Sequence, residues 1–121
     1  MAVVLIIDDS PTELHLFQNM LEQYGYGVLV ADSGEDGLRQ AAASKPDCIL
    51  MDVVMPGMNG FQATRKLSQD PATANIPVIM ITTKDQETDK IWGMRQGAVE
   101  YLVKPIAADM LVDKINAVMA R

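Results

Sequence analysis

The fold of this chain is decided near its amino terminus, by the stretch VVLIIDDSP at residues 3–11. Its first part, Val3–Ile7, is a short apolar run with the length and composition of a buried strand. Ser10 can then cap a helix, Pro11 suits the first helical turn, and Glu13 can complete a capping box. The stretch therefore predicts a strand, two carboxylates at its carboxyl end, and a helix that begins immediately afterwards.

The same alternation continues along the whole chain. Four more apolar runs are expected to be strands: Val28–Ala31, Cys48–Met51, Val78–Ile81 and Tyr101–Val103. Apolar residues at helical spacing predict five helices: one after Ser10, one over Gly34–Ala43, one carried by Phe61, Thr64 and Leu67, one capped by Asp85, and one from about Ala108. The expected fold class is α/β, a doubly wound five-stranded parallel sheet with helices on both faces. We expect the strand order 2-1-3-4-5, because the first and third runs look most buried.

The fourth expected helix carries the only tryptophan of the chain, Trp92. Its spacing places Ile91, Met94 and Ala98 on one side, which we predict to face the core. This orientation leaves Trp92 half exposed.

Composition narrows the class of protein. The chain has 121 residues, enough for one core, and a formal net charge of −6, which argues against binding nucleic-acid phosphates by bulk electrostatics. Its one cysteine, Cys48, excludes an internal disulfide and is consistent with a reducing compartment. The amino terminus resembles neither a signal peptide nor a membrane span, so we expect a cytoplasmic protein without membrane insertion.

Charged or hydroxyl residues follow every expected strand from the centre of the sheet to one edge. Asp8 and Asp9 follow the first, Asp52 the third, Thr82 the fourth and Lys104 the fifth. Ligands of such sheets bind beyond the carboxyl ends of the strands. Three carboxylates meeting there would repel one another, and a hard divalent cation, Mg²⁺, would relieve the repulsion. Each residue alone has an ordinary role in a cap or turn, so the prediction rests on their joint placement.

The same residues also suit phosphoryl chemistry. An aspartate can accept a phosphoryl group covalently, and a cation, an ammonium and a hydroxyl around it would position that group and neutralise its charge. Asp52 is the candidate acceptor, with Lys104 and Thr82 as its candidate partners.

Four segments match the motifs of one known family in order and spacing. They are residues 8–11, 50–60, 77–83 and 101–105. The chain resembles a response-regulator receiver domain over its whole length, which implies the flavodoxin-like (βα)5 fold and a single domain over residues 1–121 without an output domain. The resemblance also implies that Asp52 takes a phosphoryl group from a sensor histidine kinase or its phosphotransfer domain.

The resemblance implies roles for the other site residues as well. Asp9 would ligate Mg²⁺ directly, Asp8 largely through water, and Asp52 and the main-chain carbonyl of Val54 would complete the protein ligands. Lys104 would contact the phosphoryl group. The switch residues implied are Thr82, which would move toward that group, and Tyr101, which would turn inward behind it.

The expected output follows from these roles. The surface of the fourth helix, fifth strand and fifth helix would change its affinity for an unidentified protein target, or the domain would act as a phosphate sink. We expect a monomer that is no enzyme beyond its own phosphorylation and dephosphorylation. More narrowly, residues 61–65 and 83–93 resemble stand-alone regulators of the chemosensory system that controls type IV pilus twitching motility.

Two other functions are alternatives to a phosphoacceptor. An aspartyl-phosphate hydrolase needs a second acid two residues beyond the nucleophile, where this chain has Val54. A phosphorylation-independent interaction module would not need the acceptor-site side chains, all of which this chain retains.

Overall fold

The structure, a computed structural model, describes residues 1–120. Strands and helices alternate strictly through this part of the chain. The strands are β1 (Val3–Ile7), β2 (Gly27–Ala31), β3 (Cys48–Met51), β4 (Val78–Thr82) and β5 (Glu100–Val103). The helices are α1 (Pro11–Gln23), α2 (Gly34–Ser44), α3 (Gly60–Gln69), α4 (Glu87–Gln96) and α5 (Ala108–Met119). No helix among the described residues is long and apolar enough to cross a bilayer.

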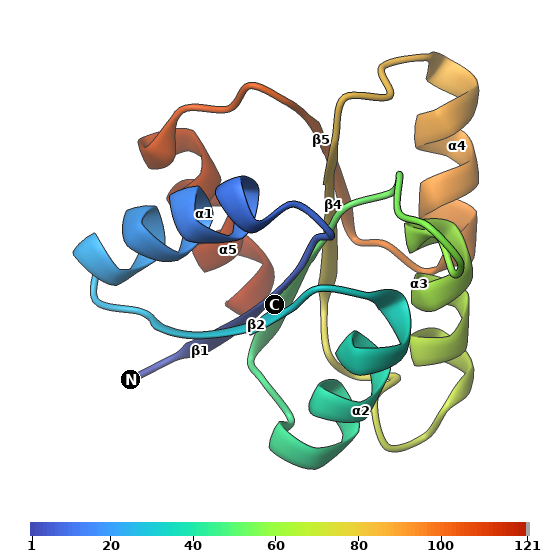
Figure 1. Cartoon of the computed structure of the whole chain (residues 1–121), viewed down its shortest axis with the longest axis horizontal. Helices are drawn as coiled ribbons and strands as arrows, with labels where there is room; N and C mark the ends of the chain where they lie inside the picture. The colour runs from blue at the N-terminus through green and yellow to red at the C-terminus, as the bar shows by residue number, and fades with distance from the viewer. Residues whose placement is uncertain (121) are drawn as a thin grey trace.

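The strands form one parallel sheet in the order β2-β1-β3-β4-β5. The fold class and the strand order predicted from the sequence are therefore confirmed. Figure 1 shows α1 and α5 on one face of the sheet and α2, α3 and α4 on the other. This arrangement gives three layers, with the sheet in the middle, and it follows from right-handed crossovers between parallel strands.

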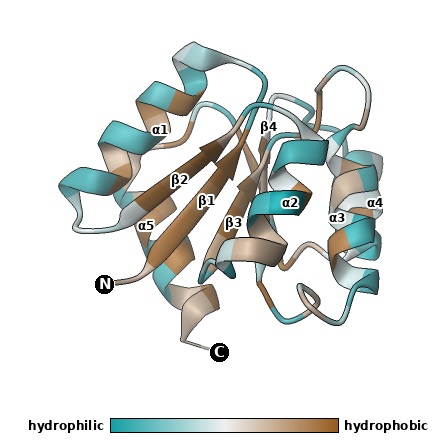
Figure 2. Cartoon of the chain, turned by 60° about the horizontal axis from the view of Figure 1, so that its bottom comes forward, coloured by the Kyte–Doolittle hydropathy of each residue, from teal (hydrophilic) through white to brown (hydrophobic). Residues whose placement is uncertain are grey.

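The core lies on both faces of the sheet because neighbouring strand residues point to opposite sides. In β1, Val4 and Ile6 pack in the cluster under α1 and α5, whereas Leu5 and Ile7 pack in the cluster under α2 and α3. Figure 2 shows the result, with hydrophobic strands in the centre and largely hydrophilic outer helix surfaces. A strand buried on both faces explains why β1 reads as a continuous apolar run rather than an alternating one.

The start of α1 differs in one detail from the expectation. Ser10 caps the helix as predicted, since its side chain accepts a hydrogen bond from the Glu13 amide. The amide of Ser10, however, donates to Asp8 Oδ1 at 2.9 Å. The reciprocal half of a capping box is therefore supplied by Asp8 and not by the Glu13 side chain, which is turned elsewhere.

The prediction for α4 was wrong in two respects. Gln86, not Asp85, occupies the N-cap position. Ile91 and Met94, expected in the core, are each 47% exposed, while the helix buries Gly93 and Gln96. Ile91 and Met94 are three residues apart, and so are Gly93 and Gln96. Helical periodicity alone therefore could not show which pair faces the core.

Three residues in and beside α4 show how the helix packs on the sheet. Ala98 is buried, but it lies beyond the end of the helix. Trp92 is half exposed, as predicted. Gly93 packs where a side chain would not fit, because an added Cβ would lie 2.7 Å from Met80 Sδ and 2.9 Å from Tyr101 Cδ2. The missing side chain of Gly93 thus lets the backbone of α4 lie close to the sheet.

Candidate functional site

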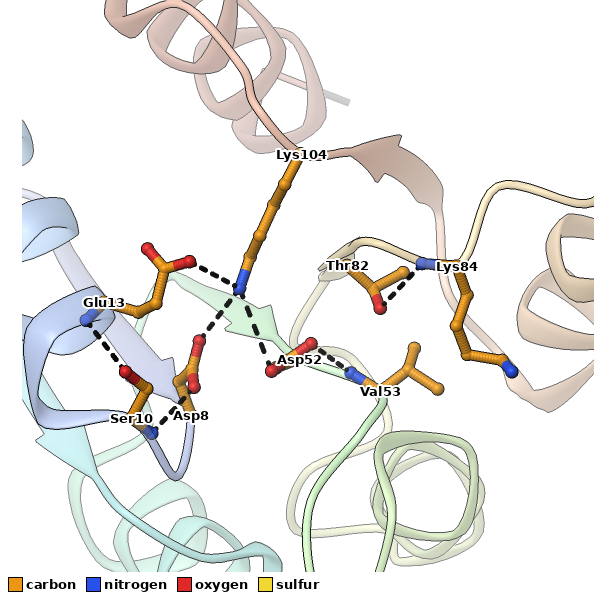
Figure 3. A network of polar contacts seen from close by, with 8 residues as sticks. All are labelled: Asp8, Ser10, Glu13, Asp52, Val53, Thr82, Lys84 and Lys104. Carbon is orange, nitrogen blue, oxygen red and sulfur yellow. Dashed lines mark hydrogen bonds and ion pairs between the residues drawn. The ribbon is translucent and has the colours of Figure 1, made fainter.

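The predicted site residues meet at the carboxyl ends of four strands. Asp8 and Asp9 follow β1, Asp52 follows β3, Thr82 ends β4 and Lys104 follows β5. Figure 3 shows the Lys104 side chain reaching between Asp8 and Asp52, with Thr82 on the other side of Asp52. The parallel sheet brings these residues together because all its strands end at the same edge.

Three carboxylates form the acidic part of the site. Asp8, Asp9 and Asp52 each offer an oxygen, and these oxygens lie within 4.8 Å of one another. Asp8 is only 3% exposed, whereas Asp9 is exposed to solvent. Burial and the nearby charge of Asp8 raise the pKa of Asp52 to about 6. Burial is the larger of these two causes, and the Lys104 ammonium opposes them only in part.

This donor set fits a hard divalent cation. Carboxylate oxygens are the ligands that Mg²⁺ prefers, and a cation beside them would stabilise the ionised form of Asp52 against the burial and the repulsion from Asp8 that raise its pKa. The side chain of Val54 is 59% exposed at the rim of the same loop, and the contribution of its main-chain carbonyl stays a prediction.

Main-chain groups of Val53 and Gly60 hold Asp52 in place. The amide of Val53 donates a 2.8 Å hydrogen bond to Asp52 Oδ1. The first residue of α3, Gly60, donates its own amide to the Val53 carbonyl at 2.9 Å. A Cβ on Gly60 would collide with the carbonyl oxygen of Asp52 and would lie 2.7 Å from Val53 Cα. The carboxylate therefore stands on backbone that is tightly packed against the start of α3.

Lys104 is the cation at the centre of the site. Its Nζ lies 3.2 Å from Asp8 Oδ2, 3.3 Å from Glu13 Oε1 and 3.8 Å from Asp52 Oδ2. Burial alone would lower the pKa of Lys104, but the charges of Asp52, Asp8 and Glu13 outweigh it and raise that pKa. The ammonium is therefore held charged. The sequence prediction included three of these four residues and missed Glu13, whose position had been interpreted only as part of a helix cap.

The hydroxyl side of the site is built around the main chain of one residue, Lys84. Thr82 is fully buried, and its Oγ1 accepts a 3.3 Å hydrogen bond from the amide of Lys84. The phenol of Tyr101 donates to the carbonyl of the same Lys84 at 3.0 Å. Burial, followed by the charges of Asp89, Asp52 and Asp85, raises the pKa of Tyr101 to about 12. Thr82 and Tyr101 are thus joined through the main chain of Lys84, a link that the sequence did not reveal.

Known proteins share this fold. The family model of the response regulator receiver domain matches residues 4–116. Protein PilH of Pseudomonas aeruginosa is 58% identical over 120 residues, which cover 99% of each chain. Response regulator PleD of Caulobacter vibrioides is 41% identical, but this chain spans only 26% of its length. The chemotaxis protein CheY4 of Vibrio cholerae superimposes with a TM-score of 0.92 at 32% identity, covering 98% of each chain.

These matches settle the class of protein. The chain belongs to the response regulator receiver domain family, as its motifs implied. Within that family it is similar to PilH along nearly its whole length, and its fold is that of the chemotaxis regulator CheY4.

Proposed function

We propose that this chain is a phosphoacceptor response regulator and that Asp52 is its acceptor. The observation that carries the proposal is the position of Asp52 among two other carboxylates and the Lys104 ammonium. Phosphoryl transfer needs little covalent help from the protein and is accelerated mainly by positioning and by neutralising charge. This pocket offers a nucleophilic carboxylate held by Val53 and a cation beside it.

The donor is a phosphohistidine of a sensor kinase or of its phosphotransfer domain. A carboxylate oxygen of Asp52 attacks phosphorus, the O–P bond forms, and the N–P bond to the imidazole breaks with the electron pair leaving on nitrogen. The attack requires the ionised carboxylate, and a pKa of about 6 leaves Asp52 ionised at neutral pH. Lys104 is placed to receive the negative charge that arrives with the phosphoryl group.

The residues that would hold Mg²⁺ are Asp8, Asp9, Asp52 and the main-chain carbonyl of Val54. An ion held by these residues would supply positive charge against the negative charge of the phosphoryl group. Asp8 also has a second task in this chain, because its two oxygens bind the Ser10 amide and Lys104.

The signal leaves the site through Thr82 and Tyr101. Thr82 moves toward the phosphoryl group, and because Thr82 and Tyr101 are both hydrogen-bonded to the main chain of Lys84, the tyrosine responds. The surface of α4, β5 and α5 then changes its affinity for a protein target, or the phosphoryl group is simply stored and lost, as in a phosphate sink. In either case the phosphoryl group favours one of two existing arrangements.

The proposed setting is a chemosensory system that controls type IV pilus twitching motility. Two findings support it: the similarity to PilH at 58% identity, and the resemblance of residues 61–65 and 83–93 to regulators of that system. We propose further that the chain works as a monomer in the cytoplasm, without nucleic acid as a partner. It catalyses no reaction beyond its own phosphorylation and dephosphorylation.

The deciding experiment is intact-mass spectrometry after incubation with acetyl phosphate and Mg²⁺. We expect one phosphoryl adduct on the wild-type protein, none on Asp52→Asn, and none when EDTA replaces Mg²⁺. Asp47→Asn is the matched control, since Asp47 precedes β3 as Asp52 follows it, and it should label normally. An adduct of equal yield on Asp52→Asn would refute the assignment. An unlabelled wild-type protein would favour the phosphorylation-independent interaction module.

A further inference from the structure

The carboxylate of Glu13 lies in the site but has no role in the proposed chemistry. It comes from the first turn of α1 and approaches Lys104 from the side away from Thr82 (Figure 3). We propose that Glu13 is a positioning residue that competes with the phosphoryl group on Asp52 for the Lys104 ammonium. The proposal rests on the proposed function, and it predicts that Glu13 limits how tightly Asp52 holds a phosphoryl group.

The distances favour competition over simple support. Lys104 Nζ is nearer to Glu13, at 3.3 Å, than to the acceptor Asp52, at 3.8 Å. The lysine side chain is 12% exposed and that of Glu13 is 32% exposed, so water screens their attraction only in part. An ammonium has three donors, and each of the three carboxylates around it can take one. A phosphoryl group on Asp52 must therefore draw the ammonium away from partners that it already has.

Local structure explains why Glu13 is available for this role. In a capping box, a glutamate at this position of a helix turns back to the amide of the N-cap residue. Here the Ser10 amide is already bound to Asp8 Oδ1. The Glu13 side chain extends instead toward Lys104, while its own amide stays bonded to the Ser10 hydroxyl.

The negative charge of Glu13 determines whether its removal should strengthen or weaken the binding of a phosphoryl group. An acyl phosphate carries more negative charge than the carboxylate it replaces, and its nearest lysine is shared with Glu13. A second anion on that lysine weakens the attraction and adds repulsion of its own. Glu13→Gln removes the charge and keeps the size and shape of the side chain. The variant should bind a phosphoryl group more tightly than the wild-type protein.

The test uses beryllofluoride, a phosphoryl mimic, titrated into the whole chain at saturating Mg²⁺ and followed by fluorine NMR. We expect Glu13→Gln to bind it about two- to ten-fold more tightly, in the range of a partly screened ion pair. Glu22→Gln, at the exposed far end of the same helix, should bind as the wild type does. Equal or weaker binding by Glu13→Gln would overturn the proposal.

A shorter acidic side chain at position 13 distinguishes direct contact with Lys104 from the effect of negative charge alone. Glu13→Asp keeps the charge but withdraws it from Lys104 by one methylene, so it should resemble Glu13→Gln if contact matters. If it behaves like the wild type, the carboxylate acts only through its charge and the positioning role is lost. The ¹⁵N shift of the Lys104 ammonium should also move in Glu13→Gln, which a change in helix stability alone would not produce.

The experiment can distinguish a failure of the proposed role of Glu13 from a failure of the proposed function. If the wild-type protein neither binds beryllofluoride nor accepts a phosphoryl group, the proposed function fails. If the wild type does both and Glu13→Gln matches it, only the role of Glu13 fails.

Discussion

Two helices approach the site through a glycine, and they do so in different ways. On the acceptor side, Gly60 of α3 lies against the main chain of Asp52 and Val53. On the hydroxyl side, Gly93 of α4 lies against the side chains of Met80 and Tyr101. Main chain within a packed fold has almost no freedom to yield, whereas a side chain can change rotamer.

This difference in packing suggests that one side of the site is rigid and the other can move. The acceptor is fixed, because its backbone is clamped by α3 and its carboxylate by the Val53 amide. The responding side is adjustable, because the Thr82 hydroxyl and the Tyr101 phenol are each joined to the main chain of Lys84 by one hydrogen bond. A phosphoryl group arriving at a fixed point can therefore move the adjustable side and leave the acceptor in place.

The largest expected effect tests the clamp directly. Gly60→Ala should lower the free energy of unfolding by about 2–4 kcal/mol, because the new methyl group meets a carbonyl oxygen that cannot move alone. Gly93→Ala should lower it by less than about 2 kcal/mol. Its overpacking is offset by the helix propensity of alanine, worth about 1 kcal/mol over glycine. Urea unfolding of the two variants measures both values, and the reverse order would break the comparison.

The next effect concerns the charge on the clamped carboxylate. The pKa of Asp52, about 6 in the folded chain against an ordinary value of 3.8, means that the folded state binds a proton more readily than the unfolded state. Stability therefore falls as the pH rises from about 4 to about 6, and the full penalty is present above that window. Without divalent cations, Asp52→Asn should be more stable than the wild type by about 1–3 kcal/mol at pH 7.5.

The same variant supplies its own control. Near pH 4 the acceptor of the wild type is largely protonated, so the advantage of Asp52→Asn should nearly vanish there. Thermal unfolding of both proteins at the two pH values, in EDTA, gives the comparison. An equal advantage at both pH values would show that the charge of Asp52 is not its source.

Sequence reasoning worked best where the sheet alone decides position. Asp8, Asp52 and Lys104 stand at strand ends, and a parallel sheet brings strand ends together whatever the side chains do. It failed where a residue has two possible partners. Glu13 fits a capping box or an ion pair with Lys104, and only the position of Asp8 decides between them.

The orientation of α4 shows a second limit. Apolar and small residues occur on more than one side of this helix, so its periodicity is ambiguous. The tertiary packing of Gly93 on Met80 and Tyr101 selects the buried side, and Ile91 and Met94 are left outside. A close backbone approach through glycine leaves no apolar signal for a periodicity argument to detect.

A spectroscopic effect of intermediate size tests the adjustable side. Trp92 precedes Gly93 in α4, is half exposed and is the only tryptophan of the chain. Beryllofluoride, added at saturating Mg²⁺, should change its fluorescence if Thr82 and Tyr101 move the helix. Thr82→Ala should weaken that change, because the variant lacks the hydroxyl that connects the site to the Lys84 amide. An identical response from Thr82→Ala and wild type would show that the signal takes another route.

The smallest expected effect tests the orientation of α4 itself. Ile91→Ser and Met94→Gln replace apolar side chains that are about half exposed, and each replacement has a helix propensity close to that of the original residue. Each should therefore change the free energy of unfolding by no more than about 0.5 kcal/mol. Leu67→Ala, in the buried face of α3, is the contrasting variant and should lower it by about 2–5 kcal/mol. If Ile91→Ser proved as costly as Leu67→Ala, α4 would turn its other side to the sheet, and Gly93 could not lie against Tyr101.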